Sequence, residues 1–203
     1  MRAIVTGVPE ATRTVHVWTA DTRFLLDRLE EMNAPGGHPL FAGRLDLDRI
    51  GVLGHSMGGA TAYRAALDDA RIKAGINLDG AQFGAPLDRP MGIPFLFVDN
   101  ETGRDLNAWA YELAEGPAYH VTVKGTEHFS YSDLSLWSPL FQAAGFTGAI
   151  DGKRVLHVMN AYTLAFFDQH LRGRPSPLFE APSPTFPEVV FEKRTPALAG
   201  SYH

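Results

Sequence analysis

The sequence predicts an α/β fold, in which a mostly parallel β-sheet is flanked by helices on both faces. Segments with the apolar pattern of strands alternate along the chain with segments that have the period of helices. The run IPFLFV at residues 93–98 is continuously apolar, which is typical of a strand buried on both faces. The chain has 203 residues, of which 45% are hydrophobic and 20% are charged, enough for one sizeable core. We therefore expect a single domain over residues 1–203.

The first predicted element is a helix that begins at Thr19 or Asp21 and ends near Met32. Either side chain is a suitable N-cap, because its oxygen accepts a hydrogen bond from a free backbone N–H of the first turn. The apolar face of this helix consists of Phe24, Leu25, Leu29 and Met32. A loop rich in glycine and proline follows over residues 33–42.

The remaining elements continue the alternation of strands and helices. Strands are expected at residues 48–53, 72–78, 93–98 and 119–123, and helices at residues 57–69, 106–115 and 155–171. The strand at 119–123 is expected to be the last one, and Gly173 and Pro175 end the final helix. The proline-rich segment from about residue 175 to residue 203 is predicted to be an extended tail over the domain surface.

The most informative motif is GHSMGG at residues 54–59, between a predicted strand and a predicted helix. G-x-S-x-G in this setting is the nucleophile elbow of the α/β-hydrolase fold, where a strained turn exposes the hydroxyl of Ser56. Gly54 and Gly58 are expected to be glycine because a Cβ would clash there. The following helix aims its backbone N–H groups at the reacting centre. We interpret His55 as a packing residue that points away from the active face.

A serine hydroxyl is a weak nucleophile, so it needs a base to take its proton and an acid to orient that base. In this fold the three residues follow in the order serine, acid, histidine. Among eight histidines, only His128 lies in the loop after the strand at 119–123, where the base is expected. The acid has two candidate places: Asp79, or Asp99 and Glu101 one strand later. Both places lie at the carboxyl edge of the sheet, and the pattern alone does not separate them.

Composition and motifs argue against several other classes of function. The net charge of −5 argues against a nucleic-acid surface, and the lack of cysteine excludes disulfides and thiolate metal sites. No dinucleotide, P-loop or zinc-protease motif is present, so no metal and no cofactor are expected. No apolar run approaches the roughly 18 residues of a membrane span. Residues 1–7 are too short an apolar stretch for a signal peptide, so the sequence leaves the compartment open: cytoplasmic by default, or secreted if an N-terminal segment is missing.

Four motifs together resemble the platelet-activating factor acetylhydrolase family, in its plasma and bacterial lipase-like branch. They are GHSMGG at 54–59, NLDG at 77–80, VDNE at 98–101 and GTEHF at 125–129. Weaker likeness in the last helix and near residue 188 extends the resemblance over roughly residues 15–195.

The resemblance implies a serine carboxylic ester hydrolase that acts on short-acyl or lipid esters without a cofactor. It implies Ser56 as nucleophile, His128 as base and Asp79 as acid, and the backbone N–H of Met57 as an oxyanion donor. Related polyester hydrolases and dienelactone-hydrolase-like enzymes share the elbow but carry the acid one strand later. The alternative is therefore a hydrolase of that type with its acid at Glu101 or Asp99.

The nucleophile lies unusually early in the chain. An α/β-hydrolase normally has several strands before the nucleophile strand, but only 55 residues precede Ser56. The sequence thus resembles the family with its early strands removed, together with the loop that usually gives a second oxyanion donor. The segment Gly36-Gly37-His38 follows a helix and is interpreted as a plain connection. Two hypotheses follow: a catalytically silent remnant, or self-association through an exposed apolar edge strand at 49–53.

Apolar side chains are concentrated between His128 and the last helix. They are Phe129, Tyr131, Leu134, Leu136, Trp137, Leu140, Phe141 and Phe146. The preferred interpretation is core packing of a loop-rich insertion, and the alternative is an acyl pocket or lid. Phe129 and Trp137 of this group, and Phe83 beyond Asp79, are the candidate substrate-binding residues.

Overall fold

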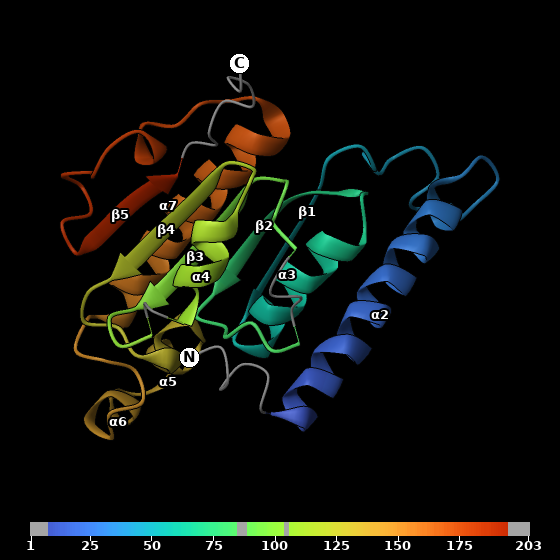
Figure 1. Cartoon of the computed structure of the whole chain (residues 1–203). Coiled ribbons are helices and arrows are strands. Elements are labelled where there is room, and N and C mark those ends of the chain that lie inside the picture. The colour runs from blue at the N-terminus through green and yellow to red at the C-terminus, as the bar shows by residue number, and fades with distance from the viewer. Residues whose placement is uncertain (1–7, 85–88, 104–105, 195–203) are drawn as a thin grey trace, which may run out of the picture.

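The computed structural model describes residues 8–84, 89–103 and 106–194, which form one five-stranded sheet in the order β1-β2-β3-β4-β5 (Figure 1). The strands are β1 (Ile50–His55), β2 (Ile72–Leu78), β3 (Phe95–Asn100), β4 (Ala118–Val123) and β5 (Val189–Arg194). The first four are parallel and β5 is antiparallel to β4. The prediction of a mostly parallel sheet is confirmed.

Helices cover both faces of this sheet. They are α2 (Pro9–Asn33), α3 (Met57–Asp68), α4 (Ala108–Leu113), α5 (Leu134–Trp137), α6 (Pro139–Ala143) and α7 (Gly152–Arg172), with the 3-10 turns η2 (His128–Tyr131) and η3 (Pro177–Phe179). Figure 1 shows α3 and α4 on the near face and α7 on the far face, with α2 packed outside α3. The short helices α5 and α6 project at the end of the sheet where the parallel strands finish.

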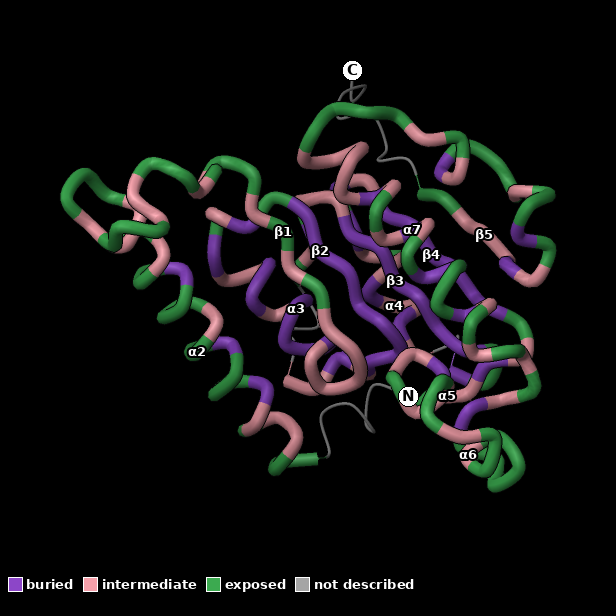
Figure 2. Tube along the Cα trace, turned by 180° about the vertical axis from the view of Figure 1, so that it is seen from behind, coloured by how far each residue is buried: buried purple, intermediate pink, exposed green. Residues whose placement is uncertain are grey.

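The core has two halves, one on each face of the sheet. Strand side chains pack against α7 in one half, around Leu96, Val121 and Phe166. In the other half they pack against α3 and α4, around Tyr63 and Phe95. Figure 2 shows the result, since the central strands are buried along their length and exposed segments are confined to the periphery. This double cover explains why the central strands read as continuous apolar runs.

Helix α2 begins ten residues earlier than the N-cap rule predicts. Its first turn contains Pro9, which suits a helix start because proline lacks the N–H that would be unpaired there. Thr19 lies inside the helix, and its hydroxyl donates to the backbone oxygen of Val15 over 2.7 Å. The predicted apolar face is also wrong in part, because Phe24 is 64% exposed and the buried positions are Val15, Thr19 and Leu26.

The C-terminal segment is not a tail lying over the surface, and the strand at 119–123 is not the last one. Strand β5 pairs with the outer edge of β4, where Val189 faces Val123. Phe179 and Phe186 of the proline-rich segment before β5 are buried against α7. The prolines misled the prediction because they suit the connection, while the open edge of β4 recruits the strand that follows it. Residues 195–203 lie outside the described part of the chain.

Strand β1 is at the edge of the sheet, and no other described strand pairs with its outer side. Leu53 on this strand is 49% exposed. The expectation of an edge strand next to the nucleophile therefore agrees with the structure. In the described ranges, no helix is long and apolar enough to cross a membrane. The expectation that residues 1–7 are not a signal peptide concerns residues outside those ranges.

Candidate active site

Ser56 lies in a strained turn between the end of β1 and the start of α3. Its backbone angles are φ 57° and ψ −124°, a conformation that costs free energy for a residue with a Cβ. The turn is held by its backbone N–H, which donates to the oxygen of Leu78 in β2 over 2.9 Å. A strained serine exposed at a strand-to-helix turn is the local geometry that the motif predicts.

The glycines around Ser56 are needed for different reasons. A Cβ on Gly54 would overlap the backbone carbonyl group of Gly58, as predicted. Gly58 itself has open space where a Cβ would be, so the prediction of a clash there is wrong. The second crowded position is Gly59, where a Cβ would overlap the side-chain oxygen of Asn77. The close approach is therefore between β1, the first turn of α3 and β2.

The structure brings Ser56, His128 and Asp79 together from three separate segments. His128 Nε2 lies 2.9 Å from Ser56 Oγ, and His128 Nδ1 lies 2.6 Å from Asp79 Oδ2. The Asp79 side chain is 3% exposed, whereas that of His128 is 40% exposed. A buried carboxylate, a partly exposed imidazole and the hydroxyl of the half-buried Ser56 thus form one chain of hydrogen bonds.

Asp79 is held in place by the next strand. Its backbone N–H donates to Val98 over 2.7 Å, and it has φ 54°. Asn100 donates to both carboxylate oxygens, from its backbone N over 2.9 Å and from Nδ2 over 2.7 Å. Asn100 was not among the predicted site residues, because only the carboxylates after this strand were candidates for the acid. The sequence could have identified Asn100 by its position, because it lies at the carboxyl end of the strand next to Asp79.

The alternative acids are engaged elsewhere. Asp99 is buried, and its oxygens lie 2.8 Å from His120 Nε2 and 2.8 Å from Asn107 Nδ2. Glu101 accepts from the backbone N–H of Gly125 over 3.2 Å. Of the three carboxylates considered, the described contacts connect only Asp79 to His128.

The interpretation of His55 as a residue that points away from the active face is wrong. Its Nε2 lies 2.9 Å from the backbone oxygen of His128, and the two imidazole rings are 4.8 Å apart. Partial burial lowers the pKa of His55, so it is neutral at neutral pH and donates from Nε2 to that oxygen. The position of His55 could have predicted this contact. His55 is the last residue of β1, and that end of the strand lies at the sheet edge where the His128 loop also lies.

The two imidazoles therefore differ in their proton affinity. The hydrogen bond that His128 donates to Asp79 raises the pKa of His128, and partial burial opposes this change. A raised pKa makes the imidazole a stronger proton acceptor, while the Asp79 contact keeps the proton on Nδ1 and leaves Nε2 free to accept.

Met57 starts helix α3, so its backbone N–H has no carbonyl partner within the helix. This position beside Ser56 suits the predicted oxyanion donor. As far as the chain is described, β1 is the first strand, and no earlier strand supplies a loop to this place. Gly36-Gly37-His38 connects α2 to β1 at the far end of α2, as predicted (Figure 1).

The candidate substrate-binding aromatics lie at different distances from this centre. The Phe129 ring contacts the His128 ring with centroids 5.2 Å apart. Trp137 on α5 is 71% exposed, and within the described ranges no hydrogen bond joins Trp137 or Phe83 to Ser56. The preferred interpretation of the segment after His128 as core packing is wrong for its five exposed members. These are Phe129, Leu136, Trp137, Leu140 and Phe146.

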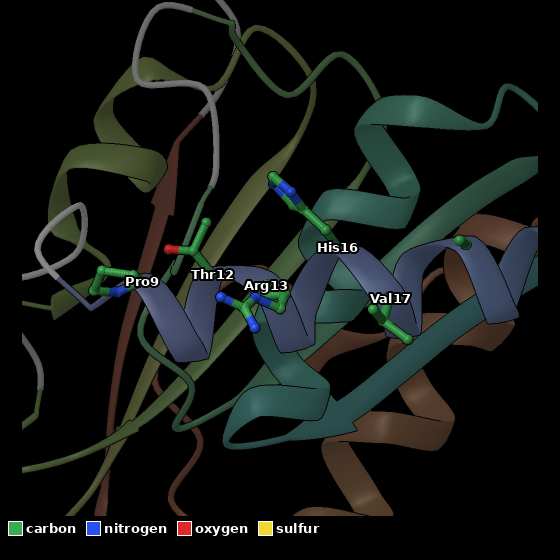
Figure 3. Close-up of a pocket in the computed structure, with 6 residues that line it drawn as sticks. Pro9, Thr12, Arg13, His16 and Val17 are labelled. Carbon is green, nitrogen blue, oxygen red and sulfur yellow. The ribbon is translucent and has the colours of Figure 1, made fainter.

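A hollow of about 610 Å³ lies along one side of α2, and none of the site residues named above lines it. Figure 3 shows that its lining side chains all come from α2, among them Pro9, Arg13 and His16. Because one helix face lines it, this hollow is not part of the candidate active site. Across the described ranges, no three His, Asp or Glu side chains are grouped so that they could hold a metal ion.

Comparison with known proteins finds similar chains that are named as esterases or acetylhydrolases. A probable 1-alkyl-2-acetylglycerophosphocholine esterase from Arthroderma benhamiae is 29% identical over 169 residues, which cover 70% of this chain and 43% of that protein. The platelet-activating factor acetylhydrolase of Canis lupus familiaris is 30% identical over 137 residues, which cover 63% of this chain and 30% of that protein. A ferulic acid esterase from Streptomyces cinnamoneus superposes with a TM-score of 0.78 at 33% identity, covering 89% of this chain and 55% of that one.

The structural similarity shows that the fold is that of the α/β-hydrolases. The chain spans less than half the length of the curated relatives it matches. Residues 38–174, more than half of the 203 residues, match the family described as platelet-activating factor acetylhydrolase, isoform II. This range includes the complete hydrogen-bond chain of Ser56, His128 and Asp79. The chain therefore belongs to the platelet-activating factor acetylhydrolase, isoform II, family.

Proposed function

We propose that this chain is a serine carboxylic ester hydrolase with Ser56 as nucleophile, His128 as general base and Asp79 as its acid. The observation that carries the proposal is the hydrogen-bond chain of 2.9 Å and 2.6 Å through His128. A serine in a strained turn, bonded to an imidazole that is itself bonded to a buried carboxylate, is the arrangement that activates a hydroxyl for acyl transfer.

The reaction follows from the positions of the protons. Ser56 Oγ attacks the ester carbonyl carbon while His128 Nε2 takes its proton, and the carbonyl oxygen becomes an oxyanion facing the N–H of Met57. The ester bond then breaks, and His128 gives its proton to the leaving alcohol. Water attacks the acyl-enzyme by the same route and releases the carboxylic acid. Asp79 stabilises the protonated His128 throughout without taking the proton.

We propose short-acyl or lipid esters as the substrate class. One relative is named as an esterase of 1-alkyl-2-acetylglycerophosphocholine, another as an acetylhydrolase of platelet-activating factor, and a structural neighbour as a ferulic acid esterase. Each of these names describes the hydrolysis of a carboxylic ester, which releases an alcohol. The exposed Phe129 beside His128 offers an apolar contact for a substrate at the open side of the site.

The experiment that tests the function is labelling of the purified chain with a fluorophosphonate, with the modified residue located by mass spectrometry. We expect one label on Ser56 and none on Ser56→Ala, because phosphonylation needs the activated hydroxyl. A folded wild-type chain that stays unlabelled would favour the alternative of a catalytically silent remnant.

The decrease of kcat/KM at low pH is expected to depend on the protonation of His128. Only neutral His128 accepts the proton of Ser56, and Asp79 raises the pKa of His128. We therefore expect kcat/KM for p-nitrophenyl acetate to fall at low pH with a midpoint above the ordinary histidine value of about 6.5. Rates measured from about pH 5 to about pH 9 give the midpoint. His157→Gln, a change on the exposed side of α7, is the control that should leave it in place.

We also propose that the chain self-associates through the outer edge of β1. That edge is unpaired in the described sheet, and Leu53 beside it is half exposed. We expect light scattering to give a mass above 22.2 kDa and Leu53→Lys to return it to that of one chain, since a lysine on an edge strand opposes pairing. Leu140→Lys, at an exposed leucine of α6, should keep the larger mass. A monomeric wild type at high concentration would refute this proposal.

A further inference from the structure

A second group of polar side chains lies buried beneath the candidate active site, and the mechanism above gives it no role. It consists of Asn77, Asp99, Asn107 and His120, here called the polar brace, and all four residues are buried. They come from β2, β3, the start of α4 and β4. Buried polar groups are costly unless each finds a partner, so their arrangement calls for an explanation.

The polar brace is a continuous chain of hydrogen bonds. His120 Nε2 lies 2.8 Å from Asp99 Oδ2, and Asn107 Nδ2 donates to Asp99 Oδ1 over 2.8 Å. Asn107 Oδ1 in turn accepts from Asn77 Nδ2 over 3.4 Å and from Gln82 Nε2 over 2.9 Å. The oxygen of Asn107 therefore determines the orientation of the Asn77 amide, whose nitrogen must face it. The orientation of Asn107 is determined in turn by the buried pair of Asp99 and His120.

At its other end the polar brace holds the turn that contains Asp79. Asn77 Oδ1 accepts from the backbone N–H of Gly80 over 2.9 Å, and Asn77 Nδ2 donates to the backbone oxygen of Gly80 over 2.7 Å. One side-chain amide thus binds both polar groups of the residue that follows Asp79. The left-handed backbone of Asp79 costs free energy, and these two hydrogen bonds offset that cost.

Asn77 also touches the nucleophile turn. A Cβ on Gly59 would overlap Asn77 Oδ1, and a Cβ on Gly80 would overlap the backbone oxygen of Ser56. The two turns are therefore packed directly against each other, with the Asn77 amide between them. A displacement of Asn77 moves the Asp79 turn relative to the Ser56 turn.

We propose that Asn77 and the polar brace behind it are positioning residues, which keep the Asp79 turn in register with the Ser56 turn so that both nitrogens of His128 are bonded at once. The kinetic consequence rests on the proposed esterase function. The structural consequence does not, because the bond between Asp79 and His128 exists without substrate. Loss of the brace misplaces the acid but leaves the open substrate side unchanged, so kcat falls and KM does not.

The test is Asn77→Ala, read by steady-state kinetics and by proton NMR. We expect kcat for p-nitrophenyl acetate to fall about 10- to 100-fold with KM within about twofold of wild type. Because His128 Nδ1 lies only 2.6 Å from Asp79 Oδ2, we expect the proton between them to be strongly deshielded and to resonate at low field in the wild type. We expect this resonance to move upfield or broaden in Asn77→Ala.

Thr19→Ala is the matched control, because it removes a different buried hydrogen bond, in α2, away from the site. It should lower the melting temperature but leave kcat and the low-field resonance unchanged. If Asn77→Ala does not fold, Asn107→Ala removes the middle of the brace and should lower kcat by about threefold or more. A folded variant with wild-type kcat and an unshifted resonance overturns the proposal. An inactive wild type that still shows the resonance contradicts the esterase function alone, and the NMR comparison then still tests the brace.

Discussion

Asp79→Asn is expected to lower kcat by about 10⁴-fold while the chain stays folded. Asp79 Oδ2 accepts a hydrogen bond from Nδ1 of His128, and both carboxylate oxygens accept hydrogen bonds from Asn100. An asparagine amide has one accepting oxygen and one donating nitrogen, so it cannot satisfy all three donors. If its nitrogen faces His128, the imidazole must carry its proton on Nε2 and can no longer accept the proton of Ser56.

Glu101→Gln is the matched control, because it makes the same chemical change at an exposed alternative acid and should keep kcat within about threefold of wild type. Asp99→Asn makes that change inside the polar brace, so we expect a loss of kcat that is much smaller than that of Asp79→Asn. At position 99 an amide oxygen still accepts from Asn107, and the amide nitrogen pairs with the other tautomer of His120. Loss of activity in Glu101→Gln or Asp99→Asn alone, with an active Asp79→Asn, would instead support the polyester or dienelactone type of hydrolase. Circular dichroism melts verify that all three variants fold.

Gly54→Ala is expected to destabilise the chain by about 3 kcal/mol or more, which is among the largest effects of a single methyl group. The added Cβ would overlap the backbone carbonyl group of Gly58, and a backbone group has no rotamer with which to move aside. Relief requires the end of β1 to separate from α3, which disrupts the elbow and the core behind Tyr63. Urea unfolding followed by circular dichroism measures the change.

The control is Gly58→Ala, two residues beyond Ser56. An alanine there meets no atom within 4 Å, and Gly58 lies in the first turn of α3 without a positive φ. Alanine favours the helix over glycine, so we expect stabilisation by about 0.5 to 1 kcal/mol. Equal changes in the free energy of unfolding for Gly54→Ala and Gly58→Ala would contradict the close packing of Gly54 against Gly58.

The local sequence was sufficient to predict the parallel strands of the sheet and the nucleophile turn. The prediction for residues 72–78 coincides with β2, of which every residue except Lys73 is buried, because small and apolar residues dominate this segment. Ser56 was recognisable because its strained turn restricts the neighbouring residues, and the restriction is written into the motif itself. His128 followed from topology, since the loop after the fourth parallel strand ends at the same edge as Ser56.

Other elements depend on contacts that no local pattern contains. Strand β5 forms because β4 has an open edge, and the proline-rich sequence before it gives no sign of that edge. Helix α2 starts at Pro9, although Thr19 and Asp21 satisfy the rules for an N-cap, because packing against α3 stabilises the earlier turns. His55 turned toward His128 for a similar reason, since the His128 loop folds back over the end of β1.

By itself, the sequence determined the α/β class, the parallel strands and the strained serine turn, because each depends on residues adjacent in the chain or on a regular apolar pattern. The residue pattern left Asp79, Asp99 and Glu101 open as the acid, and the family resemblance implied Asp79. The tertiary structure adds the contacts: Asp79 meets His128, Asp99 meets His120, and Glu101 meets the backbone N–H of Gly125. It also revealed Asn77 between the two turns. These choices rest on hydrogen bonds between residues far apart in sequence, whose geometry exists only once the strands lie side by side.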